Sequence, residues 1–167
     1  LINCTISDNG IGISNFNGSV TIKNTIVADN AFDITEPINV SSSYNLIGTG
    51  GSGGLANGVN NNQVGITNPG LLALASNGGL TQTHALSNCS PAINTGTNSG
   101  APSTDQRGSS RPFGGVTDKG SYELQSAAGS INISSAVTNV SCSGGNNGVI
   151  DLTVTGTAPY TYAWSAG

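Results

Sequence analysis

The chain has 167 residues and a formal net charge of −4, and only 7% of its residues are charged, against about 25% in typical globular domains. With only four basic residues, the composition excludes a nucleic-acid-binding patch and disfavours anionic membranes. No apolar run approaches the roughly 20 residues that a membrane-spanning helix needs. Ile, Val and Thr recur between clusters of Asn and Gly, and this pattern predicts an all-β fold.

The N-terminal part of the chain contains a short repeat. The stretches INCTISDN and IKNTIVADN align Ile2 with Ile22 and Ile6 with Ile26, and a looser third copy, SYNLIG, places Ile47 another 21 residues on. A period of about 20 residues with β-branched residues and terminal Asn is typical of a stacked solenoid. The repeat predicts a single-stranded parallel β-helix with Ile2, Ile22 and Ile47 in one inward column, successive side chains lying about 4.8 Å apart.

The segment Gly48–Gly65 is dominated by Gly and Asn, which predicts a flexible surface loop. The alternative is a phosphate-binding loop. We disfavour this alternative because no GK[ST] motif and no predicted helix follow the glycines.

His84 is the only histidine, and it lies in the alternating stretch GGLTQTHAL. A hydrolase would pair it with a serine or cysteine nucleophile and a carboxylate. The sequence shows no nucleophile elbow and no CGSC-type motif, although Cys89 lies nearby. We therefore expect a structural strand histidine whose ring nitrogens bond to neighbouring backbone.

Most of the charge is concentrated in one stretch, TDQRGSSRPFGGVTDKGSYEL. Arginine can bridge two carboxylates and several carbonyl groups at once, so we predict a structural ion-pair cluster rather than catalytic residues. The alternative is the carboxylate pair of a glycosidase or an arginine-assisted lyase. The predicted cluster consists of Asp105, Arg107, Arg111, Asp118 and Glu123.

Three aspartates are a weak candidate for a calcium site. Asp8 and Asp29 each precede an Asn at equivalent turns, and Asp33 follows closely. Carboxylate and backbone oxygens suit Ca²⁺, but Asp-Asn pairs are ordinary in turns. We expect no cofactor and no metal, with Ca²⁺ as the alternative.

Three aromatic residues, Tyr160, Tyr162 and Trp164, alternate along YTYAW and would share one face of a strand. They are candidate ligand-binding residues, because flat rings stack on sugars. The alternative, which we favour, is the buried face of a β-sandwich.

The stretch NPGLLALASNGGLTQTHAL, followed by SPAINTG and TDQRGSSRPFGGVTDKGSYE, closely resembles the choice-of-anchor Q domain. The resemblance covers roughly residues 44–123. It implies the closing segment of a right-handed parallel β-helix with a pectate-lyase-like fold, and it implies that His84 belongs to the pattern of the module. One departure is Lys119, where the family usually has an apolar residue. We expect Lys119 to face solvent or to pair with an acid.

The C-terminal stretch ISSAVTNVSCSGGNNGVIDLTVTGTAPYTYAWSAG resembles the SprB repeat of bacterial surface adhesins. The resemblance implies a partial Ig-like β-sandwich over residues 133–167. It would follow the end of the parallel β-helix with its closing segment, residues 1–125, and a linker, residues 126–132. We expect Cys142 to be unpaired within this chain, whereas the pairing of Cys4 with Cys89 stays open.

Together these features predict a non-catalytic segment of a large secreted bacterial cell-surface protein. It would serve as a scaffold that contributes to adhesion to glycans or surfaces. The chain begins within a repeat, so we expect it to be part of a longer polypeptide. The alternatives are a pure spacer and the C-terminal part of a polysaccharide lyase or hydrolase with catalytic coils upstream.

Overall fold

The computed structural model describes residues 1–125 and 132–155. The chain divides into two compact units, Leu1–Ser126 and Ala127–Gly167. The described part is all-β: short strands form several small sheets, and the one helix is the 3₁₀ turn η1 (Val59–Asn61). The prediction of an all-β chain is therefore confirmed.

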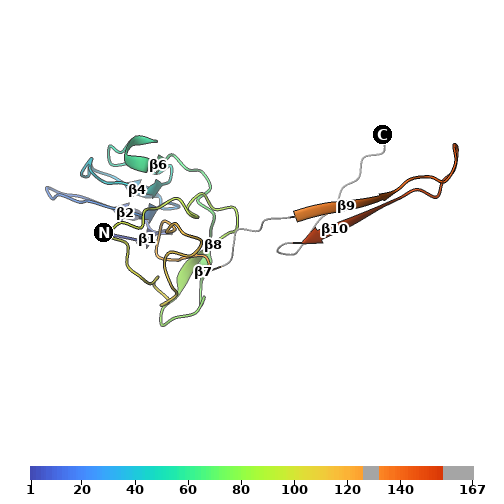
Figure 1. Ribbon diagram of the computed structural model, residues 1–167. Coiled ribbons are helices and arrows are strands. Elements are labelled where there is room, and N and C mark those ends of the chain that lie inside the picture. Colours follow the sequence, from blue (N-terminus) through green and yellow to red (C-terminus); the bar gives the residue numbers. More distant parts are fainter. Residues whose placement is uncertain (126–131, 156–167) are drawn as a thin grey trace. The chain divides into compact units, whose positions relative to one another are not determined.

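The first unit is built on two small parallel sheets, whose strands follow one another from the N-terminus (Figure 1). The larger sheet has the order β1-β3-β5-β6, and the smaller one pairs β2 with β4. The strands of the larger sheet are β1 (Thr5–Ile6), β3 (Ile26–Val27), β5 (Leu46–Ile47) and β6 (Gln63–Val64). Those of the smaller sheet are β2 (Ile11–Ile13) and β4 (Phe32–Ile34). Each turn of chain thus adds one strand alongside the previous one.

The strand register differs from the predicted one. Ile6 pairs with Val27, Val27 with Ile47, and Ile47 with Val64, so successive partners lie 21, 20 and 17 positions apart. Ile2 instead forms a bridge with Lys23 and is 48% exposed. The predicted column of Ile2, Ile22 and Ile47 is wrong, because a shift of one residue moves a side chain to the other face of a strand.

The interior enclosed by the two parallel sheets is apolar. Val27 and Ile47 face this interior from the larger sheet, and Ile13 and Ile34 face it from the smaller one. Ile22 is also fully buried there, although it lies outside the strands. This core accounts for the recurrent β-branched residues of the repeat, since equivalent positions stack on each other from one turn to the next.

A ladder of buried polar side chains runs beside the larger sheet. The backbone N–H of Cys4 donates to Thr25 Oγ1, that of Thr25 to Asn45 Oδ1, and that of Asn45 to Asn62 Oδ1. The Asn45 amide also donates to the Ile22 carbonyl and to Asn62 Oδ1. Each side chain thus satisfies a backbone group of the preceding turn that the short strands leave unpaired.

Replacing Asn45 with alanine is expected to lower the free energy of unfolding by about 2–4 kcal/mol, because three buried hydrogen bonds are lost together. Chemical denaturation of the full chain, followed by amide signals of the first unit, measures this loss. Asn88→Ala is the matched control, since Asn88 is exposed, and it should change stability by less than about 0.5 kcal/mol. Equal effects of the two substitutions would contradict a structural role for the ladder.

The segment Gly48–Gly65 packs against the preceding turn of chain at Gly50 and Leu55, so the prediction of a surface loop holds only for the exposed residues 56–61. Gly50 exchanges hydrogen bonds with Asp33, and Leu55 is only 6% exposed in the core. A Cβ atom at Gly50 would lie 2.7 Å from the backbone nitrogen of Asp33. Glycine is needed here because the two turns approach closely.

The closing segment, residues 66–124, packs on the outer face of the larger sheet. It contains the antiparallel pair β7 (Leu71–Ala75) and β8 (Thr83–Leu86). Ile26 and Leu46 point away from the coil interior and form a second core with Leu86 and Ala92. The two central strands, β3 and β5, are therefore covered on both faces, as their wholly apolar sequences require.

The second unit is described as one hairpin of β9 (Asn132–Thr138) and β10 (Val149–Thr155). Val137 lies opposite Ile150, and Ile133 lies opposite Val154. The predicted strand in GVIDLTVTG corresponds to β10. Alternation along both strands gathers the apolar residues on one face of the hairpin.

Candidate functional site

The carboxylate of Asp105 is the centre of the first ion pair in the closing segment. Its oxygens accept backbone N–H groups of Arg107, Ser109 and Glu123 at 2.8, 3.0 and 3.0 Å. They also accept Arg107 Nε at 2.9 Å and Nη2 at 2.7 Å. Burial alone would raise the pKa of Asp105, but the hydrogen bonds from Glu123, Arg107 and Ser109 outweigh it and hold the pKa below its usual value.

Arg107 ties three parts of the closing segment together. Besides its bidentate contact with Asp105, it donates to the carbonyl oxygens of Glu123 at 2.7 Å and Asn77 at 3.3 Å. Its guanidinium also lies 3.6 Å from the centre of the Tyr122 ring. A planar fork that stacks and bonds at once explains why arginine rather than lysine occupies this position.

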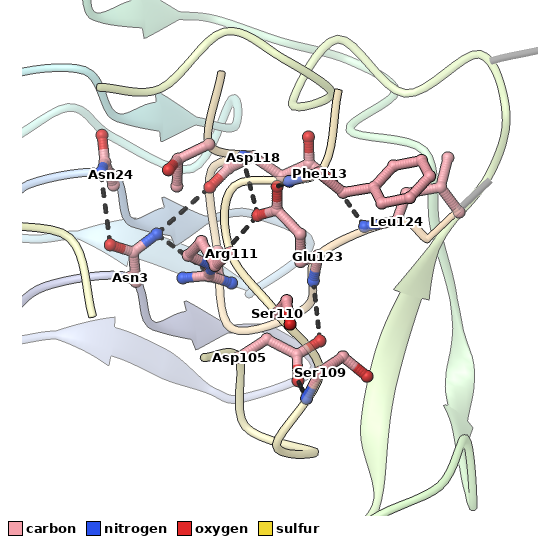
Figure 2. A network of polar contacts seen from close by, with 12 residues as sticks. Asn3, Asn24, Asp105, Ser109, Ser110, Arg111, Phe113, Asp118, Glu123 and Leu124 are labelled. Atoms are coloured by element: carbon pink, nitrogen blue, oxygen red, sulfur yellow. Dashed lines mark hydrogen bonds and ion pairs between the residues drawn. The ribbon is translucent and has the colours of Figure 1, made fainter. Parts of the chain in front are cut away.

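A second, deeper ion pair joins Arg111 to Glu123 (Figure 2). Arg111 Nε lies 3.0 Å from Glu123 Oε2 without the alignment of a hydrogen bond, and the two side chains are 1% and 0% exposed. Glu123 also accepts the backbone N–H groups of Phe113 and Asp118. Burial, with a smaller contribution from Asp118, raises the pKa of Glu123, and burial lowers the pKa of Arg111.

Asp118 lies beside this pair without an arginine contact of its own. Its oxygens accept the backbone N–H groups of Asn94 and Leu124, both at 2.7 Å. Burial raises the pKa of Asp118, because these bonds compensate only part of its lost hydration. The structure therefore brings all five predicted residues together, as three carboxylates with two guanidinium groups.

Two asparagines that the sequence analysis did not single out join this network. Asn3 Nδ2 donates to the carbonyl oxygens of Asp118 and Gly120, and Asn24 Nδ2 donates to Asn3 Oδ1. They tie the corner of the first two turns to the closing segment. Their repetition 21 positions apart was the available signal, but so many other asparagines are present that it did not stand out.

Lys119 is buried, which corrects the prediction that it faces solvent or pairs with an acid. Its side chain is 1% exposed, and Nζ donates to the carbonyl oxygens of Asn45 and Asn61, both at 3.3 Å. Burial lowers the pKa of Lys119 to about 8. Through these two carbonyl oxygens, the lysine joins the closing segment to two successive turns of the chain.

His84 lies in β8 and links the closing segment to a turn of the coil. Its Nδ1 is 2.8 Å from the carbonyl oxygen of Leu72, and its Nε2 is 3.8 Å from Asp8 Oδ2. Because a carbonyl oxygen only accepts, Nδ1 carries a proton and donates. The contact between His84 and Leu72 is the ring-to-backbone bond predicted from the sequence.

The three aspartates of the calcium hypothesis are engaged differently from one another. Asp33 is 1% exposed and accepts N–H groups from Asn30 and Gly50. Burial, followed by repulsion from Asp8 and Asp33, raises the pKa of Asp29. Within residues 1–125 and 132–155, no group of three His, Cys, Asp or Glu side chains is placed to hold a metal ion.

A pocket of about 410 Å³, lined mostly by residues with polar side chains, lies beside the ion-pair cluster, between the first turn and the closing segment. Cys4 and Thr5 line it on one side, and Thr104, Gln106 and Arg111 line it on the other. The three cysteines, all within the described residues, carry free thiols. The predicted aromatic group of Tyr160, Tyr162 and Trp164 lies outside the described residues.

Among the described residues, no helix is long and apolar enough to cross a membrane. Comparison with curated proteins and with solved structures gave no match. Residues 134–167 match the family of the SprB repeat. This part of the chain is thus similar to a repeat that is typical of cell-surface, adhesin-like proteins.

Proposed function

We propose that this chain is a non-catalytic segment of a large secreted bacterial cell-surface protein, a scaffold that contributes to adhesion to glycans or surfaces. Residues 1–125 form the end of a right-handed parallel β-helix with a closing segment of the choice-of-anchor Q type. Residues 126–132 act as a linker, and residues 133–167 belong to a SprB-type repeat. The match of the SprB repeat to residues 134–167 supports the surface location.

The β-helix interpretation is supported by the parallel ladders. Four strands pair in chain order with 21, 20 and 17 residues between partners, and β2 pairs with β4 in the same sense. Each turn of chain therefore contributes one strand to a growing sheet, the arrangement of a solenoid. The resemblance over residues 44–123 supports the assignment of the closing segment.

The non-catalytic interpretation is carried by one observation: every carboxylate oxygen of Asp105, Asp118 and Glu123 accepts a hydrogen bond from the chain itself. A general acid or base must reach the proton that it transfers, directly or through one water molecule. These carboxylates are buried and engaged with backbone N–H groups. Their geometry suits the fixing of a segment rather than proton transfer.

The test is a combined binding and turnover assay on the full chain. Immobilised glycans are incubated with the protein in the presence of Ca²⁺, and both the retained protein and the released sugar fragments are measured. We expect saturable retention with no release of fragments. Release that depends on Asp105 or Arg111 would overturn the non-catalytic assignment, and a lack of retention on every glycan would overturn the adhesive role.

A further inference from the structure

We propose that the pocket beside the ion-pair cluster binds one neutral sugar unit of a glycan. The proposal deepens the adhesive function above and rests on it. The pocket is open to solvent and has a volume of about 410 Å³, which lies within the range of about 300–1,000 Å³ that is usual for small-molecule sites. Residues from the first turn and the closing segment line it together, so folding of the closing segment forms it.

The guanidinium group of Arg111, which lines the pocket, has an N–H donor without an acceptor. Nη2 of Arg111 donates to Gly120, and its Nε faces Glu123. Among the described residues, its Nη1 has no acceptor. Arg111 lines the pocket, and in the described part of the chain its Nε, not its Nη1, is the fully buried nitrogen without a hydrogen-bond partner. Nη1 is therefore the nitrogen from which a ligand oxygen in the pocket would accept a hydrogen bond.

The charge around Arg111 selects a neutral ligand. Asp105 also lines the pocket, and the cluster behind it holds three carboxylates but only two guanidinium groups. An anion would meet this excess of negative charge at close range. A hydroxyl oxygen accepts the N–H of Arg111 without adding charge.

The rim supplies the mixture of groups that a polyhydroxylated ring needs. Within the described part of the chain, Thr104 Oγ1 and Gln106 Oε1 have no partner, whereas Gln106 Nε2 is held by Thr81 Oγ1 at 2.8 Å. Pro102 adds an apolar surface to the same wall. Donors, acceptors and a C–H surface within one sugar-sized pocket together match the two kinds of face on a pyranose ring.

Cys4 provides a built-in reporter of occupancy. Its thiol lines the pocket, is half-buried, and lies 3.3 Å from the carbonyl oxygen of Ile2. Cys89 and Cys142 are exposed and do not line the pocket. A bound ligand should therefore shield one of the three thiols and leave the other two reactive.

The experiment measures the rate at which iodoacetamide alkylates each cysteine of the full chain, by mass spectrometry of peptides. The probes are the methyl glycosides of glucose, galactose and mannose, for which a dissociation constant on the order of 1 mM is expected from the size of the ligand. A glycoside at ten times its dissociation constant should slow alkylation of Cys4 about tenfold. The rates at Cys89 and Cys142 should stay unchanged.

Two substitutions locate the effect. Thr104→Phe fills the pocket and should abolish binding of the methyl glycosides, measured by saturation-transfer NMR. Thr67→Phe makes the same change at an exposed position away from the pocket and should bind as the native chain does. If the full chain is retained on neutral glycans while Cys4 stays unprotected, the pocket proposal is wrong and the adhesive function stands. If the full chain is retained on no glycan, neutral or charged, both are wrong.

Discussion

Replacing Arg111 with methionine is expected to lower the free energy of unfolding by about 3–5 kcal/mol, the usual cost of removing one partner from a buried ion pair. Glu123 is fully buried, and Asp118 lies beside it. Without Arg111, both carboxylates lack their nearest guanidinium group. Denaturant unfolding of the full chain, followed by amide signals of the first unit, measures the loss.

The pH dependence of this variant follows from Glu123. Burial already raises its pKa above the ordinary value of 4.5, and loss of Arg111 raises the pKa further. The folded state then binds more protons than the unfolded state above about pH 4.5, so stability falls as the pH rises. The deficit relative to the native chain should therefore grow from acid to neutral pH.

A paired substitution provides the control. Arg111→Met combined with Glu123→Gln removes both charges and leaves an acceptor for the N–H of Phe113. The double variant should be more stable at pH 7 than Arg111→Met alone. A single variant within about 1 kcal/mol of the native chain would contradict a structural role for the buried pair.

Replacing Lys119 with methionine is expected to raise the free energy of unfolding by about 1–3 kcal/mol near pH 7, because a buried ammonium without a carboxylate partner is exchanged for an apolar chain of similar length. Gln63 N–H still donates to the Asn45 carbonyl in this variant, so that oxygen keeps a partner. Thermal and denaturant unfolding measure the gain.

The pH dependence of stability follows from the pKa of Lys119, which is about 8 in the folded protein and 10.5 for an ordinary lysine. Between these values the unfolded state binds more protons, so the native chain gains stability as the pH rises from 8 toward 10.5. Lys119→Met should lack this gain. Lys23→Met makes the same change at the half-exposed lysine and should keep it. A pH profile of Lys119→Met that matches the native chain would show that Lys119 is not buried.

The ion-pair residues could be predicted because charge is scarce in this sequence. Charged residues make up only 7% of the chain, yet six of them, the five of the predicted cluster and Lys119, fall between Asp105 and Glu123. Such a concentration indicates mutual contact, and the structure brings all five residues together. Their partners among backbone N–H groups could not be predicted, because those depend on the path of an irregular segment.

Register and burial were harder to predict. The repeat suggested a constant period, but the spacing changes from 21 to 20 to 17 positions, and an error of one residue reverses the faces of a strand. Lys119 was expected to face solvent or to pair with an acid, because lysine is almost never fully buried unless it is paired. In this chain its ammonium group instead donates hydrogen bonds to the carbonyl oxygens of Asn45 and Asn61.

The most direct test of the central claim, that the closing segment folds as one body with the stacked turns, is native-state amide hydrogen exchange on the full chain. The N–H groups of Asp118 and Leu124 should open with the same free energy as those of Leu46 and Gly48 in the parallel sheet, and Arg111→Met should lower all four by equal amounts. Exchange of the Asp118 and Leu124 amides at a much lower free energy, with Leu46 and Gly48 unaffected by Arg111→Met, would contradict the account.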